Sequence, residues 1–406
     1  MLLGLGLSLA LQAAPGKLLR DDNLRAEASA DARVLALLNR GEAVEILERQ
    51  GGWTRIGTAR GEGWVRLLSV RGDVAAQTAP LAELRGELSP ASRRLETRIV
   101  AVAGFRGGEE EERIEAAGQA ALERLERFRL SAAEASAAAG RLGLVAGRDA
   151  TVCGASPWSD VDTDAASGGA RLSLMSAWLL NRLSAEDEAR IGRALAVRLL
   201  IAMPAVEDAE AQRAVNRVGR WLVAAQGGRA QAQWLFAVLD SDEIHAWSAP
   251  GGYVLITSGL YRQLRDEAEL AAVLAREIAR LADKRVLRDL RQHGPGSGRP
   301  ADEAAFLRGL LGNGMEALVR PYAAESEYQA DRAAVLLASR AGYDGYALAA
   351  FLQNLGGMAD GDPRLATLAR THPRVETRLA RLADSLEECL ARLPAGKAPP
   401  LYRMNN

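Results

Sequence analysis

Three residues in one stretch of the chain have the spacing of a metal-binding catalytic motif. Arg276, Glu277 and Arg280 lie within residues 270–285, which the sequence predicts as a helix. In the motif His-Glu-x-x-His, two imidazoles one turn apart hold a metal ion and the glutamate activates water. Here Glu277 keeps the general-base position, whereas arginine occupies both ligand positions. The spacing predicts the scaffold of a metal site and puts its chemistry in question.

Arginine cannot replace histidine as a metal ligand. Helical residues four apart stand about 40° apart around the axis, so their side chains converge on one face. Two imidazoles placed this way would grip one zinc ion, but a guanidinium group is protonated at ordinary pH and has no lone pair to donate. A catalytic zinc needs three protein ligands, so ordinary zinc catalysis is not expected from this helix.

The length and composition predict a globular protein with two or three domains. The chain has 406 residues, of which 48% are hydrophobic and 25% are charged. Its formal net charge is -1 and its lysines and arginines are scattered among acids. No basic field for nucleic acid stands out, so a nucleic-acid partner is not expected.

Residues 1–14 form a short apolar run that ends in small residues, with Ala10 and Ala13 as candidate cleavage positions. The run is too short to span a bilayer and predicts a secretory signal segment, although no Lys or Arg precedes it. No later apolar run reaches the roughly 20 residues of a membrane span. The two cysteines, Cys153 and Cys389, either pair in an oxidising compartment or remain buried thiols.

Residues 17–72 have short β-like runs at 34–38, 43–49, 53–56 and 63–68, separated by glycine-bearing turns. Short strands with frequent turns predict a small β-barrel. The segment resembles a bacterial SH3 domain on residues 38–47, 51–56 and 61–65. Trp53 and Trp64 form either a ligand groove or part of the small core.

The middle of the chain has no catalytic signature. Residues 73–150 are rich in Ala, Glu, Arg and Leu and predict a helical connector or docking arm. We expect a linker over residues 151–182, a second domain over residues 183–394 and a tail over residues 395–406.

Four ordered blocks stand out in the second domain, at residues 215–219, 244–260, 276–280 and 325–331, and two further segments at 341–344 and 371–373 fit the same pattern. On these blocks the domain resembles the catalytic domain of peptidase family M48, the zinc metallopeptidases that include the CAAX prenyl endopeptidases. The resemblance implies a gluzincin-type domain that is mainly α-helical with a small β-sheet.

The resemblance also implies roles for single residues. Glu327 matches the third metal ligand, and Asp331 matches the carboxylate that orients a ligand histidine. Arg378 matches an arginine that polarises the scissile carbonyl, and the alternative is that it pairs with a carboxylate left without metal. Because both ligand histidines are arginine, we expect Arg276 and Arg280 to pair with these carboxylates and to link the two helices in place of metal. The alternative for both arginines is an ordinary exposed polar face.

A second interpretation keeps a metal. His245 lies where family members usually have asparagine, and His372 belongs to a His-Pro loop that approaches the zinc in some relatives. With Glu327 and Glu277 these histidines would build a displaced zinc site. Nearby arginines oppose any cation, so the main expectation is that no cofactor binds.

Residues Tyr253, Val254, Leu255 and Ile256 have the β-branched and aromatic character of a strand. In the family this strand borders the cleft, where an extended peptide can add to it through backbone hydrogen bonds. The alternative is a strand that only completes the sheet.

These features together predict an inactive metallopeptidase relative, a pseudoenzyme, that works in the periplasm or elsewhere in the bacterial cell envelope. It would bind a peptide or an unfolded or assembling protein as a chaperone, scaffold or regulator. Expected partners are a protein client, and also an active protease paralogue, the envelope assembly machinery or peptidoglycan. The competing functions are an active zinc metalloendopeptidase with rearranged ligands and a cell-wall binding module that acts through the SH3-like domain.

Overall fold

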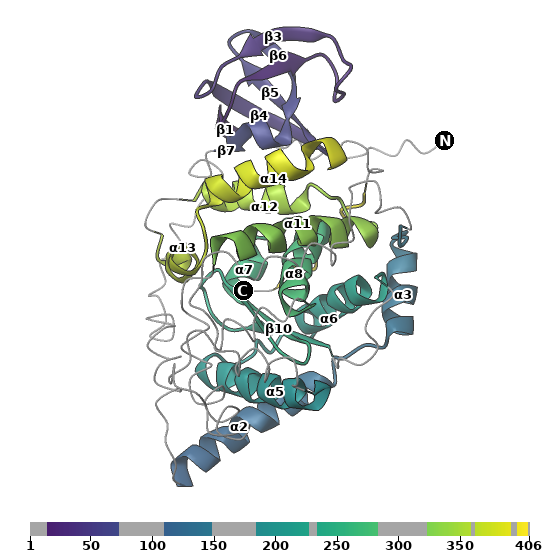
Figure 1. The fold of residues 1–406 in the computed structure, drawn as a ribbon, viewed down its shortest axis with the longest axis vertical. Helices are drawn as coiled ribbons and strands as arrows, with labels where there is room; N and C mark the ends of the chain where they lie inside the picture. Colours follow the sequence, from purple (N-terminus) through teal and green to yellow (C-terminus); the bar gives the residue numbers. More distant parts are fainter. Residues whose placement is uncertain are drawn as a thin grey trace, which may run out of the picture. The chain divides into compact units, whose positions relative to one another are not determined.

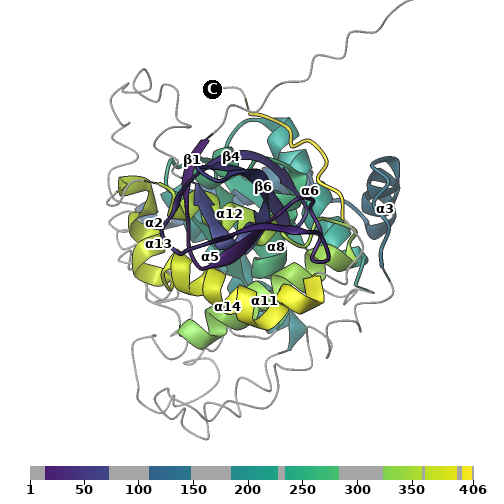
Figure 2. The same cartoon turned by 90° about the horizontal axis from the view of Figure 1, so that it is seen from above.

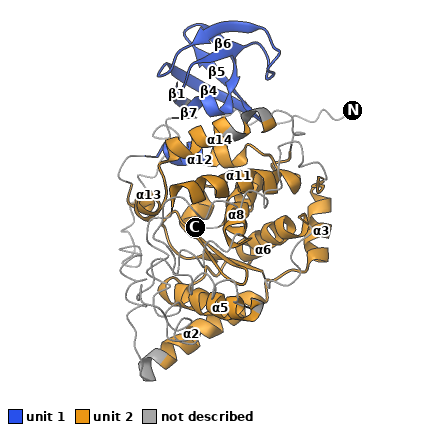
Figure 3. Cartoon of the chain, in the orientation of Figure 1, with its two compact units in different colours: residues 1–86, 352–360 blue, residues 87–351, 361–406 orange. Residues whose placement is uncertain are grey.

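The computed structural model describes seven segments of the chain (Figure 1), which divide between two compact units (Figure 3). The first unit comprises residues 1–86 and 352–360, and the second comprises residues 87–351 and 361–406. No helix in the described segments is long and apolar enough to cross a membrane. The described segments are residues 14–72, 109–147, 184–226, 234–282, 323–358, 362–390 and 396–404.

The first unit is an antiparallel sheet of seven strands in the order β3-β2-β6-β5-β4-β1-β7. The predicted small barrel is not closed, because β3 and β7 remain as two edges of the sheet. A β-bulge shifts the register between Ile46 and Glu48 on β4. The elements are β1 (Ala14–Leu18), β2 (Asp22–Arg25), β3 (Val34–Leu38), β4 (Ala43–Gln50), β5 (Trp53–Thr58), β6 (Gly61–Arg66), the 3-10 helix η1 (Leu67–Ser69) and β7 (Val70–Gly72).

Period-two alternation decides which side chains fill this unit. Ile56 and Val65 face a core of eight buried aliphatic residues, and neither Trp53 nor Trp64 belongs to it. Both tryptophans are half-buried on the opposite face of β5 and β6. The core-filling interpretation of the two tryptophans is therefore wrong.

The first unit also contains a piece of chain that is distant in sequence. Gln353 is buried, and its Nε2 donates hydrogen bonds to the carbonyl of Val70 (2.6 Å) and to that of Leu67. The first unit thus includes more than the predicted SH3-like segment 17–72, and its sheet begins at Ala14.

The second unit is mainly helical and has one small sheet of β8 (Leu235–Leu239), β9 (Ala246–Ala249) and β10 (Tyr253–Thr257). Figures 1 and 2 both show α14 beside α11. The described helices are α2 (Glu109–Glu126), α3 (Ala132–Arg141), α5 (Ala185–Ala202), α6 (Ala209–Ala224), α7 (Ser258–Gln263), α8 (Glu267–Ala282), α11 (Ala324–Arg340), α12 (Ala347–Gly356, continuing into the first unit), η5 (Pro363–Leu365), α13 (Ala366–Thr371) and α14 (Val375–Leu390).

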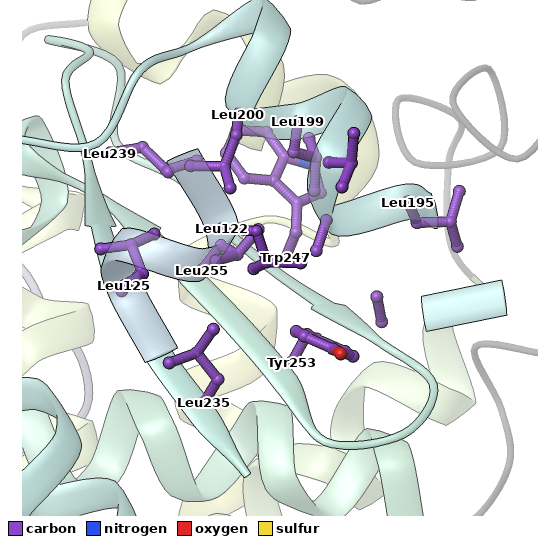
Figure 4. Packing of buried hydrophobic residues seen from close by; sticks show 14 of the residues in the cluster. Leu122, Leu125, Leu195, Leu199, Leu200, Leu235, Leu239, Trp247, Tyr253 and Leu255 are labelled. Atoms are coloured by element: carbon purple, nitrogen blue, oxygen red, sulfur yellow. The ribbon is translucent and has the colours of Figure 1, made fainter. Parts of the chain in front are cut away.

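Helix α2 differs from the expected connector because it is part of the core of the second unit. Leu122 and Leu125 lie in the same buried cluster as Trp247 of β9 and Leu255 of β10 (Figure 4). On the polar side, Arg193 of α5 donates hydrogen bonds to α2, at 3.1 Å to Gln119 and at 2.9 Å to Glu126. A docking arm would not bury its leucines in this way.

The small sheet has the order β8-β10-β9, with β10 parallel to β8 and antiparallel to β9. The turn between β9 and β10 contains Gly251 with φ +79°, a conformation that favours glycine. Helix α5 approaches this turn closely, since a Cβ on Gly192 would lie 1.6 Å from the carbonyl oxygen of Pro250. The two glycines let α5 hold the hairpin.

Two amide side chains of α6 close the outer edge of β8. Gln212 accepts a hydrogen bond from the Val238 N–H (3.0 Å) and donates one to the Val238 carbonyl (2.9 Å). One turn later Asn216 bonds both backbone groups of Phe236 in the same way. These amides give hydrogen-bond partners to buried backbone groups of β8, and the Val238 carbonyl also accepts from the Val206 N–H (3.0 Å).

Residues 396–404 differ from the expected tail because they are bound to the second unit. The Glu267 N–H donates to the Pro399 carbonyl (2.8 Å), and the Asp344 N–H donates to the Lys397 carbonyl (3.0 Å). Tyr402 donates its hydroxyl to Asp208 at the start of α6 (3.1 Å). This strap ties the N-terminal end of α8 to the segment that follows α11.

We predict that Asn216→Leu destabilises the second unit by roughly 2 to 4 kcal/mol, because the N–H and C=O of Phe236 lose their partners inside the protein. Urea unfolding followed by helical circular dichroism measures this change. The exposed Arg213 on the same helix is the matched control, and Arg213→Ala should stay within about 0.5 kcal/mol of the parent. Equal stability of Asn216→Leu and the parent would contradict the role given to Asn216.

Candidate functional site

Helices α8 and α11 bring the motif residues together in the interior of the second unit. Arg276 and Arg280 are only 6% and 5% exposed, and Glu277, Glu327 and Asp331 are 2% exposed or less. The exposed-face interpretation of the two arginines is therefore wrong. Their burial requires that every charge has a partner.

Arg276 contacts three carboxylates through its three nitrogens. Its Nε lies 3.0 Å from Asp331 Oδ1 and its Nη1 lies 2.8 Å from Glu277 Oε1. Its Nη2 donates to Glu327 Oε2. Burial lowers the pKa of Arg276, as does the neighbouring positive charge of Arg378, while the carboxylates of Asp331 and Glu277 oppose the shift.

Arg280 completes the coordination of Glu327. Its Nη1 lies 2.7 Å from Glu327 Oε1, so the two oxygens of this carboxylate accept from two different arginines. Its Nε lies 3.8 Å from Glu277 Oε2. The structure thus places both arginines against the expected carboxylates, across the contact between α8 and α11.

Glu277, the general-base position of the motif, has both carboxylate oxygens engaged. Oε1 accepts from Arg276, and Oε2 accepts from the hydroxyl of Ser248 on β9 at 2.8 Å. A general base must reach the proton it abstracts with a free lone pair. In this arrangement Glu277 acts as an acceptor for fixed donors.

Asp331 is held by a third arginine, from α14. Arg378 donates through Nε to Oδ2 (2.8 Å) and through Nη2 to Oδ1 (2.7 Å), a bidentate pair. Burial by itself would raise the pKa of Asp331, but the guanidinium groups of Arg378 and Arg276 outweigh it and lower that pKa below its usual value. Arg378 is committed to Asp331, where the family resemblance implied a contact with substrate.

The six side chains form one charge-balanced group, which we term the guanidinium cluster. It contains three guanidinium groups and three carboxylates and joins α8, α11 and α14, with Ser248 attaching β9. Its members are Arg276, Arg280, Arg378, Glu277, Glu327 and Asp331.

The histidines of the proposed displaced metal site lie beside the guanidinium cluster and do not form a ligand set. His372 has its Nε2 3.4 Å from Glu327 Oε2 and its Nδ1 2.7 Å from the hydroxyl of Thr371. His245 stacks on Trp247, with ring centroids 4.2 Å apart. Within the described segments no three His, Cys, Asp or Glu side chains are grouped so that they could hold one metal ion.

Zinc does not fit the residues at this position. Both ligand positions on α8 carry cationic side chains with no lone pair, and both oxygens of Glu327 already accept hydrogen bonds from them. A cation placed there would face two positive charges at the sites where it needs donors. The side chains at the two ligand positions are therefore themselves unsuited to zinc.

The strand that was expected to bind peptide has no free edge. Tyr253, Val254, Leu255 and Ile256 lie in β10, which is the central strand and is paired on both sides. Its residues are all buried. A peptide cannot add to a strand whose two edges are occupied, so β10 completes the sheet, and the edge strand next to the guanidinium cluster is β9.

Ser248 is the site residue that sequence reasoning missed. The alternation of side chains between the two faces of a strand indicates where Ser248 points. His245 and Trp247 stack together, and Ser248 lies on the other face, toward Glu277 of α8. Recognition of β9 as a separate strand would have identified it.

Comparison with known proteins agrees with this architecture. The model of Peptidase family M48 matches residues 209–386, from the start of α6 into α14, and the model of the bacterial SH3 domain matches residues 20–69. Residues 209–386 are therefore similar to peptidase family M48. Both resemblances found in the sequence are thereby confirmed.

Several relatives of this chain are proteases by name. The beta-barrel assembly-enhancing protease of Escherichia coli (strain K12) is 28% identical over 213 residues, which are 49% of this chain and 43% of that protein. The putative beta-barrel assembly-enhancing protease of Vibrio cholerae is 27% identical over 235 residues, 54% of this chain and 47% of that protein. The mitochondrial metalloendopeptidase OMA1 of Bos taurus is 28% identical over 193 residues, 43% of this chain and 36% of that protein. The chain spans less than half the length of these relatives.

We predict that the second unit loses stability as the pH falls from about 7 to 5. Burial, together with the charges of Arg280 and Arg276, lowers the pKa of His245 from 6.5 to about 3, and burial lowers that of His372 well below 6.5. The folded protein therefore keeps these imidazoles neutral, while the unfolded chain binds their protons below about pH 6.5. Each histidine costs up to roughly 1.4 kcal/mol per pH unit in this range.

The variant His245→Asn should show a smaller loss, by up to about that amount per pH unit, in urea unfolding followed by helical circular dichroism. The buried carboxyl groups of Glu267 and Glu269 act in the opposite sense, since burial raises their pKa. They are common to parent and variant, so the difference in slope isolates His245. Identical slopes would contradict this assignment.

Proposed function

We propose that this protein is a catalytically silent M48 relative that binds a peptide, or an unfolded or assembling protein, in the bacterial cell envelope. The observation that carries the proposal is the guanidinium cluster, in which Arg276 and Arg280 occupy the positions of the metal ligands and engage Glu327. Loss of the ligands removes the Lewis acid, and the contacts with Arg276 and Ser248 hold the Glu277 carboxylate as an acceptor for fixed donors.

Peptide holding can persist without cleavage, because backbone hydrogen bonds need no particular side chain. The outer edge of β9 is the candidate for this contact, since among the described residues β9 pairs with β10 on one side only. Trp247, Ser248 and Ala249 have buried side chains, so the contact would be made through the backbone of β9. The client would be held as by a chaperone, scaffold or regulator.

The location and partners follow from the relatives and from one cysteine. Relatives named beta-barrel assembly-enhancing proteases support work alongside the envelope assembly machinery or an active protease of the same family. Cys389 on α14 is disulfide-bonded, which supports an oxidising compartment such as the periplasm. Cys153 and residues 1–13 of the predicted signal segment 1–14 lie outside the described residues, and both candidate cleavage positions precede β1.

We predict that the purified full chain contains no stoichiometric zinc by elemental analysis and does not cleave casein. The physical reason is that guanidinium groups supply no metal-donor lone pair at the two motif positions. Addition of a chelator should change neither result. Stoichiometric zinc with chelator-sensitive cleavage would establish the alternative, an active zinc metalloendopeptidase with rearranged ligands.

A second candidate function, cell-wall binding, is favoured by the outer face of the first unit. Trp64 on β6 lies in register between Arg25 and Arg55, and Trp53 on β5 lies opposite Arg66. Both tryptophans are excluded from the core and remain half-exposed. An aromatic face flanked by guanidinium groups suits a ligand that has flat apolar surfaces and carboxylates, such as peptidoglycan.

We predict that Trp53→Ala with Trp64→Ala reduces cosedimentation with purified peptidoglycan at least tenfold while leaving the sheet folded, because neither ring fills the core. Leu37→Ala, at an exposed position of edge strand β3, is the matched control and should bind as the parent does. Unchanged cosedimentation of the double variant would remove the tryptophan face from consideration.

A further inference from the structure

We propose that Arg276 and Arg280 act as a single unit that replaces the charge of a divalent cation, so that restoring either histidine alone unbalances the guanidinium cluster and restoring both makes the fold depend on zinc. This inference deepens the proposed function, since it rests on the same silent site, and it explains how the fold tolerates loss of the metal.

The charges within the guanidinium cluster support this proposal. Two guanidinium groups contribute the same charge of +2 that one zinc ion contributes with two neutral imidazoles. Arg378 adds a third positive charge, and two of its nitrogens lie 2.7 and 2.8 Å from Asp331. Three carboxylates balance these three positive charges. The cluster is neutral as it stands, and it would be equally neutral with two histidines and zinc.

The geometry makes the two arginines interdependent. Glu327 is 1% exposed and divides its oxygens between them, Oε2 to Arg276 and Oε1 to Arg280. If one arginine becomes a neutral histidine, three buried carboxylates face two guanidinium groups. A buried charge that has lost its partner is strongly destabilising, whereas a balanced group is tolerated.

A single restored histidine also cannot recruit zinc to repair the imbalance. Of the three motif ligands it would restore one imidazole beside Glu327 and leave the third position cationic, with His372 as the neighbouring imidazole, 3.4 Å from Glu327 Oε2. The remaining arginine would still direct its positive charge at the same position. The two substitutions are therefore expected to be tolerated only together.

Thermal melting of the parent and four full-length variants tests this inference, first in chelator and then with one equivalent of zinc. The variants are Arg276→His, Arg280→His, the double variant and Arg213→His, which is the matched exposed control. We expect each single variant to melt more than about 5 °C below the parent and neither to respond to zinc. The double variant should melt lowest in chelator, rise with zinc and bind it at one ion per chain by calorimetry. The parent and Arg213→His should ignore zinc.

A charge-rescue pair keeps the proposal falsifiable if the double variant does not fold. Arg280→His leaves one excess negative charge, and Glu327→Gln alone leaves one excess positive charge. The combination Arg280→His with Glu327→Gln restores neutrality, so it should melt above Arg280→His alone. Additive losses in this pair, or a folded double variant that ignores zinc, would overturn the inference. Cleavage by the parent protein would instead overturn the proposed function, so the two failures are distinguishable.

Discussion

Glu327 connects the guanidinium cluster, because its two oxygens accept from two arginines on the neighbouring helix. Through Arg276 the connection extends to Asp331 and Glu277, and through Asp331 it reaches Arg378 on α14. A buried ion network of this kind does not by itself make a fold more stable than a hydrophobic core would. Each member is nevertheless required for stability, since loss of any one member leaves a buried charge without a partner.

The hydrophobic framework determines where this network lies. Helix α5, helix α2 and the small sheet share one core around Trp247, which fixes β9 (Figure 4). Because β9 is fixed, Ser248 meets Glu277 at 2.8 Å and attaches the sheet to the guanidinium cluster. The amides of Gln212 and Asn216 close the opposite edge at β8, so β9 is the edge strand that adjoins the cluster.

The sequence allowed prediction of the helix with Arg276 and Arg280, because helical spacing is a local rule. Their distant carboxylate partners Glu327 and Asp331 were expected from the resemblance to family M48 together with charge complementarity. The predicted strands of the first unit were close to β3, β4, β5 and β6, since alternation and glycine turns define them, whereas β1, β2 and β7 were not predicted. The position of Trp53 outside the core and the open edges of the sheet were not predictable in this way. Both depend on strand order, which a local pattern does not specify.

The departures in the second unit have the same origin. Leu122 of α2 has an ordinary helical spacing, and only the surface of α5 decides whether it is exposed or buried. Likewise, the composition of Tyr253–Thr257 indicates a strand, but its central place depends on pairing with β8, which precedes it by a long connection. The proposed peptide contact therefore lies at β9 and not at β10.

Hydrogen exchange of the amides in α8 and α11 tests the replacement of metal by guanidinium groups most directly. The unmodified full chain is measured as purified, after exhaustive chelation and after addition of zinc, because a bound metal would stabilise the folded state by mass action. The account predicts the same protection of both helices in all three samples. Loss of protection on chelation, restored by zinc, would contradict it.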